Sequence, residues 1–133
     1  MAVELSRPGK TSVAITDTTY ATVAEELMDT YMKRGDGRKV TTSKLRSIYA
    51  LVANLSARVN APDEYEPHRQ DIQNLKVRMA YEAGREPTVR AFLDATGLLA
   101  LVDAVSSFEQ LTLYCRYAEA LVAYFKYFGG KDR

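Results

Sequence analysis

A chain of 133 residues is long enough for one domain with one hydrophobic core. Hydrophobic residues make up 47% and charged residues 26%, which is ordinary for a soluble globular protein. The 18 basic and 17 acidic residues nearly cancel, so overall charge does not demand a nucleic-acid partner, although a local basic patch would still allow one. The single cysteine excludes an internal disulfide, and neither a membrane span nor a secretory signal is evident, so we expect a cytoplasmic protein.

The first 19 residues show no apolar period and contain Pro8 and Gly9, so we expect a loosely ordered N-terminal arm over residues 1–19. The remainder, residues 20–133, is expected to form one helical-bundle domain. Its first helix is predicted over residues 20–33, with Val23, Met28 and Tyr31 on one stripe, before the glycines around residue 36 end it.

Two further helices follow at short intervals. Residues 42–59 have good N-cap residues at their start and an apolar repeat of three to four residues. A polar connector over residues 60–67 leads to a helix over residues 69–83, and Gly84 fits the position just past its end. The regular apolar spacing in both segments indicates helices that each bury one face.

The last third of the chain is the most apolar. Pro87 suits the first turn of a helix that stops near Gly97, and residues 98–105 are apolar on all sides, which implies burial. A long final helix is predicted over residues 108–128, with Ser107 as a suitable N-cap. Since no segment alternates apolar and polar residues for long enough to be a strand, the predicted fold is an all-α compact bundle of five to six helices.

Basic residues gather around the start of the helix at residue 42. Between residues 33 and 46 there are six basic residues and one acid. Lys44 and Arg46 occupy the first turn, where the helix dipole disfavours positive charge, so an anion such as a phosphate would explain them. An ordinary solvated loop with surface lysines is the alternative.

Residues for catalysis or metal binding are not apparent. His68 is the only histidine and has no neighbouring ligand, Cys115 falls on an apolar stripe and suits a buried structural thiol, and no nucleotide-binding or metalloprotease motif is present. We therefore expect no catalytic residue, no metal, no cofactor and no enzymatic activity.

Three segments together resemble the small subunit of type III-A CRISPR effector (Csm) complexes. They are residues 41–46 (TTSKLR), 80–85 (AYEAGR) and 119–131 (EALVAYFKYFGGK). The resemblance implies an all-helical, non-catalytic subunit present in several copies. These copies would help to form the channel for the duplex of guide RNA and target RNA, beside other subunits that carry the chemistry. The motif positions that would meet RNA are Lys44, Arg46, Arg85, Lys126 and Lys131.

Arg78 and Lys39 are added to these candidates because of their position and charge alone. In such a complex base pairing reads the sequence, so the small subunit need only contact the RNA backbone. Several weak sites in adjacent copies would add up through avidity. Copies that stack head to tail need two different surfaces, and the acidic residues of the helix over 20–33 are one candidate.

Two other functions are compatible with the sequence. One is a helical protein-interaction module without a nucleic-acid role. The other is a helix-turn-helix DNA-binding protein, but the loop before residue 41 is longer than the turn of that motif.

Overall fold

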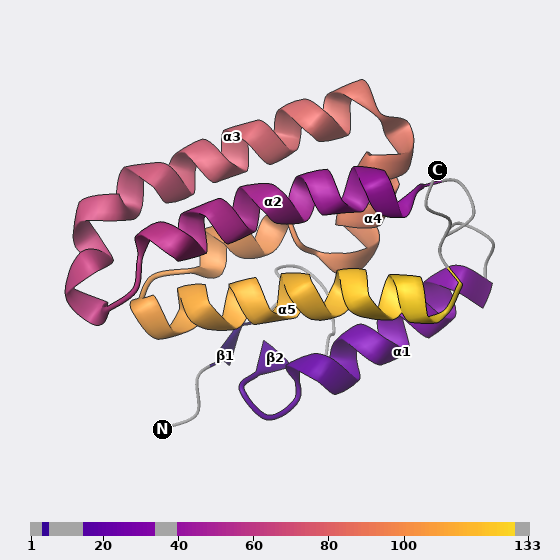
Figure 1. The fold of residues 1–133 in the computed structure, drawn as a ribbon, viewed down its shortest axis with the longest axis horizontal. Helices are drawn as coiled ribbons and strands as arrows, with labels where there is room; N and C mark the ends of the chain where they lie inside the picture. The colour runs from indigo at the N-terminus through magenta and orange to yellow at the C-terminus, as the bar shows by residue number, and fades with distance from the viewer. Residues whose placement is uncertain (1–3, 6–14, 34–39, 130–133) are drawn as a thin grey trace.

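The computed structural model describes residues 4–5, 15–33 and 40–129, and this part of the chain folds into a bundle of five α-helices (Figure 1). The helices are α1 (Tyr20–Lys33), α2 (Thr42–Arg58), α3 (Arg69–Arg85), α4 (Pro87–Thr96) and α5 (Phe108–Tyr127). Short 3₁₀ helices form the connections η2 (Pro62–Glu64), η3 (Glu66–His68) and η4 (Ala100–Ala104). The predicted all-α bundle of five to six helices is confirmed.

Helix α5 is the centre of the bundle. It packs against α1 on one side and α2 on the other, while α3 packs against α2 and α4 (Figure 1). Tyr114 and Tyr117 of α5 are fully buried, and their hydroxyl groups donate hydrogen bonds to the backbone carbonyls of Leu98, at 2.7 Å, and Thr96, at 2.8 Å. Because both buried hydroxyls have acceptors, these tyrosines fix α5 against the end of α4 and the segment that follows it, without leaving their own hydroxyls unpaired.

A short antiparallel ribbon precedes the bundle. Strand β1 (Glu4–Leu5) pairs with β2 (Ile15–Thr16), and Ile15 is completely buried. Two-residue strands are too short to show an alternating pattern, so the sequence did not predict them. The described part of the predicted arm therefore joins the core at Ile15, and the boundary between arm and domain at residue 20 stays a prediction.

Three of the helix ends follow local capping signals. Thr41 and Ser107 are N-caps whose side chains accept from the backbone N–H groups of Lys44 and Gln110, and Gly97 ends α4 with a φ of 73°. The prediction that Gly84 lies past the end of α3 was wrong, because the helix continues through Arg85. Pro87 sets the true end, since a proline disfavours helical geometry in the residue before it and Glu86 is extended, with φ −130° and ψ 103°.

Replacing Gly84 with alanine is expected to raise the free energy of unfolding by about 0.5–1 kcal/mol, because glycine inside a helix is entropically unfavourable. A Cβ atom added at Gly84 would meet nothing within 4 Å. Urea denaturation measures the change. Gly129→Ala is the matched control, since its Cβ is equally free but its φ of +100° is strained for alanine. Equal stabilisation by both variants would contradict this explanation.

Across the described residues, no helix combines the length and the apolar character needed to span a membrane.

Candidate nucleic-acid interface

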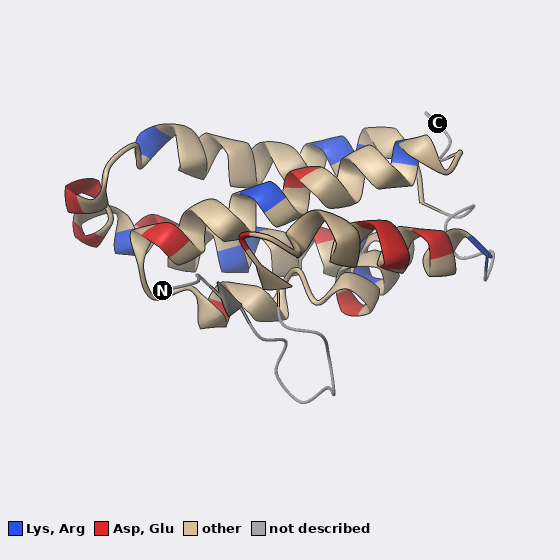
Figure 2. Ribbon diagram, turned by 90° about the horizontal axis from the view of Figure 1, so that it is seen from below, with Lys and Arg blue, Asp and Glu red and all other residues tan. Residues whose placement is uncertain are grey.

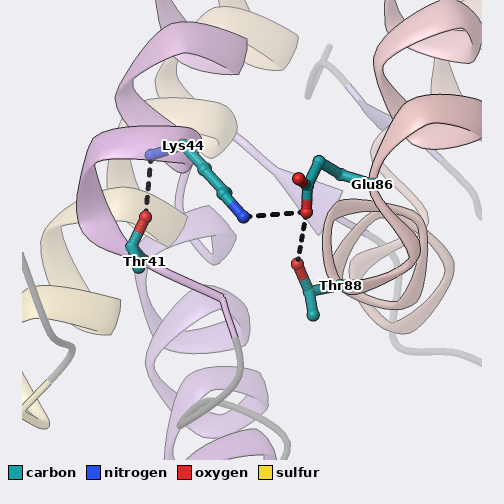
Figure 3. Close-up of polar contacts among 4 residues, drawn as sticks. All are labelled: Thr41, Lys44, Glu86 and Thr88. Atoms are coloured by element: carbon teal, nitrogen blue, oxygen red, sulfur yellow. Dashed lines mark hydrogen bonds and ion pairs between the residues drawn. The ribbon is translucent and has the colours of Figure 1, made fainter. Parts of the chain in front are cut away.

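The start of α2 positions the two basic residues that stand out in the sequence. Thr41 Oγ1 accepts a hydrogen bond from the Lys44 backbone N–H at 3.2 Å, which fixes the first turn (Figure 3). Leu45 and Ile48 point into the core, so Lys44 is left partly buried at the edge and Arg46 faces solvent. Helix α2 contains three basic residues and no acid over its 17 residues. Its outer face therefore carries positive charge near both ends and no acidic side chain.

The Lys44 ammonium is paired within the chain. Its Nζ lies 2.8 Å from Glu86 Oε2, between α2 and the turn that joins α3 to α4, and the two side chains are 40% and 38% exposed (Figure 3). Thr88 Oγ1 donates to the same carboxylate oxygen at 3.5 Å. The hydrogen bond from Lys44 lowers the pKa of Glu86, aided by the positive charges of Lys44 and Arg85. The anion beside the first turn of α2 is thus a carboxylate of the same chain.

Arg46 and Arg78 differ from Lys44 because neither has an acidic partner within the part of the chain that the structure describes. Both side chains are exposed, one on α2 and the other on the neighbouring helix α3. Their charges are available to an external anion. These two arginines are predicted RNA contacts that have no acidic partner among the described residues.

A narrow groove between α2 and α3 includes Arg78. Its polar walls are formed by Asn54 and Arg58 from α2 and by Asp71, Asn74 and Arg78 from α3. Arg58 lies 3.8 Å from the Asp71 carboxylate. The groove has a volume of about 70 Å³, far below the roughly 300–1,000 Å³ of small-molecule sites. Arg58 is paired with Asp71, so Arg78 and the two amide groups are what this small groove offers to a phosphate backbone, and it is too small to capture a small ligand.

Of the remaining predicted residues, two lie within the described structure and two lie outside it. Arg85 pairs with Glu82 at 3.4 Å and lies over the Tyr81 ring at 5.6 Å, and Lys126 is in the last turn of α5. Lys39 and Lys131 lie outside the described residues.

Four of the predicted residues share one end of the bundle. The first turn of α2 and the last turns of α3 and α5 meet there (Figure 1), which places Lys44, Arg46, Arg85 and Lys126 at that end. Arg78 is seven residues before Arg85, about 10 Å back along α3. The candidate interface therefore runs from this end of the bundle along α2 and α3.

Charge is segregated on the molecule. In Figure 2 blue segments dominate the upper edge, whereas red segments are frequent on α1 and at the turn between α2 and α3. On α1 both Glu25 and Glu26 are exposed, and Asp29 pairs with Lys33 at 3.0 Å. An anionic ligand would be attracted to the edge with α2 and repelled from α1.

Sequence reasoning did not single out Arg58, Asn54 and Asn74, which line the groove. Arg58 could have been predicted from the sequence, because α2 contains basic residues and no acid. The two asparagines had no such signal, because only the packing of α2 on α3 brings them together.

The groups considered for catalysis have structural surroundings. His68 Nδ1 lies 2.8 Å from the backbone oxygen of Glu64, and no cluster of three metal-binding side chains occurs among the described residues. Cys115 is half-buried, and burial raises its pKa to about 11, so its thiol is protonated near neutral pH and is a poor nucleophile.

These features define a small helical protein with a positive face on two adjacent helices. Comparison with known proteins identifies its family: a family model for Csm2 of type III-A matches residues 20–131. The chain therefore belongs to the Csm2 family, the small subunit of type III-A CRISPR complexes.

Several relatives carry the name CRISPR system Cms protein Csm2. One from Streptococcus thermophilus is 34% identical over 119 residues, which covers 89% of this chain and 98% of the relative. Another from Enterococcus italicus is 42% identical over 95 residues, covering 67% of this chain and 68% of the relative. A third, from Mycobacterium tuberculosis, is 35% identical over 108 residues, covering 76% and 85%.

Proposed function

We propose that this chain is a non-catalytic subunit that lines the guide–target channel of its complex and binds the backbone of the target RNA without reading its sequence. The observation that supports this most is the pair Arg46 and Arg78, which face solvent from adjacent helices and have no acidic partner in the described structure. Guanidinium groups bind phosphates well, and contacts to phosphate position an RNA without specifying its bases.

The proposed partners are the target RNA, the guide RNA paired with it, the other subunits of the complex and further copies of this chain. A few exposed cations on a nearly neutral protein favour weak binding by each copy. Several copies side by side would gain avidity, so no single site needs to be tight. The acidic outer face of α1 remains a candidate contact between copies. We propose a cytoplasmic location, where such a complex would meet its RNA.

Binding of single-stranded RNA at several salt concentrations tests the proposal. The purified chain is expected to bind two RNAs of equal length and unrelated sequence with similar affinity. The slope of log affinity against log salt should be about −0.7 for each phosphate contact. A strong preference for one of the two sequences would contradict backbone binding, and the absence of RNA binding at low salt by both the chain and its complex would contradict an RNA-binding role.

A protein-interaction module without an RNA role is the second candidate. On the outer surface of α3, Val77 and Tyr81 lie one turn apart and are 65% and 64% exposed, so together they form a small apolar surface. If this function is correct, replacing Arg46 and Arg78 will leave both RNA binding and assembly of the complex unchanged. Replacing Val77 and Tyr81 with serine will instead prevent assembly.

A further inference from the structure

We propose that Glu86 is an internal competitor for RNA at Lys44: its carboxylate holds the lysine ammonium in the free protein, and a phosphate must displace it to bind there. This inference rests on the proposed RNA-binding function. In the free protein the Lys44 charge is therefore neutralised by Glu86. Removing the Glu86 carboxylate is expected to strengthen RNA binding.

The pair that carries this inference is held in place from both sides. Lys44 Nζ and Glu86 Oε2 are 2.8 Å apart although the residues are 42 positions apart in the chain. The Thr41 cap fixes the Lys44 backbone at the start of α2 (Figure 3). The proline that begins α4 favours the extended backbone of Glu86. Since both residues sit at helix starts, the contact does not depend on a flexible loop.

The groups around Glu86 are those that would also hold a phosphate oxygen. The carboxylate accepts from the Lys44 ammonium and from the Thr88 hydroxyl, and it lies beside the first turns of both α2 and α4. Ammonium groups, hydroxyl groups and helix N-termini are common phosphate ligands. A carboxylate in this place therefore satisfies the same donors that an RNA phosphate would use.

Other cations near the interface are less restrained. Arg85 has a longer contact of 3.4 Å, with Glu82 one turn away on its own helix. Arg46 has no acidic partner among the described residues. Wild-type binding is therefore expected to depend on Arg46 more than on Lys44.

The test is single-stranded RNA binding by Glu86→Gln, which keeps the shape of the side chain and removes its charge. We expect affinity to rise about three- to tenfold, because one more cation becomes available. The salt slope should steepen by about 0.7, the contribution of one more phosphate contact. Asp94→Asn is the matched control: it removes one acid from α4, paired with Arg90 at 3.9 Å on the exposed surface, and should change neither quantity appreciably.

Lys44→Ala provides a second measurement that does not require the Glu86 variant to fold. In the wild-type background it should weaken RNA binding less than Arg46→Ala does. In the Glu86→Gln background it should abolish the gain in affinity, so the two changes are not additive. Unchanged or weaker binding by a folded Glu86→Gln variant, or equal losses for Lys44→Ala and Arg46→Ala, would overturn the inference. Absence of RNA binding by the wild-type protein would instead overturn the proposed function.

Discussion

Replacing Arg46 and Arg78 together with alanine should lower the affinity for single-stranded RNA by about ten- to a hundredfold at low salt, because two charge-assisted phosphate contacts are lost. The salt slope should become shallower by about 1.4, twice the contribution of one contact. Both side chains are exposed, and neither forms an ion pair with an acid in the described structure. The free energy of unfolding in urea should therefore not change. Fluorescence anisotropy with labelled RNA measures affinity and slope on the same samples.

The matched control is the double variant Arg69→Ala with Arg90→Ala. It also removes two positive charges, but Arg69 pairs with Glu66 at 3.4 Å and Arg90 pairs with Asp94 at 3.9 Å, both at exposed sites. Little effect on RNA binding is expected. If both double variants lose affinity equally, net charge rather than the edge formed by α2 and α3 determines binding.

Phe92→Ala should reduce the free energy of unfolding by about 3–5 kcal/mol, through lost burial and the cavity left behind. Phe92 is 1% exposed and meets the rings of Tyr31 and Phe125 edge to face, at centroid distances of 5.7 and 6.3 Å. The three rings join α4 to α1 and α5. Because small domains have only about 5–15 kcal/mol of stability, this change removes a large part of it.

Urea denaturation followed by circular dichroism measures this loss, with Phe92→Leu as the control. Leucine keeps most of the apolar volume, so the control is expected to lose less than half as much as the alanine variant. A loss of under about 1 kcal/mol for Phe92→Ala would mean that the contact among α1, α4 and α5 is not central to stability.

Local signals in the sequence explain why most of the helices could be predicted. Thr41 and Ser107 cap α2 and α5 through bonds to residues three positions later, and Gly97 ends α4 by its own conformation. These contacts depend only on neighbouring residues. Gly84 misled the prediction because a glycine near a helix end is usually terminal, yet Pro87 determined where α3 stops.

The candidate site was less predictable because its defining contacts are distant in sequence. Lys44 and Glu86 are 42 positions apart in the chain. The sequence shows that the first turn of α2 is basic, but only the fold shows that the anion beside Lys44 is a carboxylate of the same chain. The groove between Asn54 and Asn74 depends on how α2 packs against α3. Periodicity and charge indicated a basic edge, but only the fold separates cations that are paired within the chain from those that remain available.

The most direct test of RNA-backbone binding by this subunit is target-RNA binding by the assembled type III-A complex. The complex should be prepared with either the wild-type chain or the variant carrying Arg46→Ala and Arg78→Ala, and titrated with target RNA at two salt concentrations. We expect both complexes to assemble and the variant complex to bind target RNA more weakly, with a shallower salt slope. Identical affinity and slope in two fully assembled complexes would contradict the claim that this subunit binds the RNA backbone.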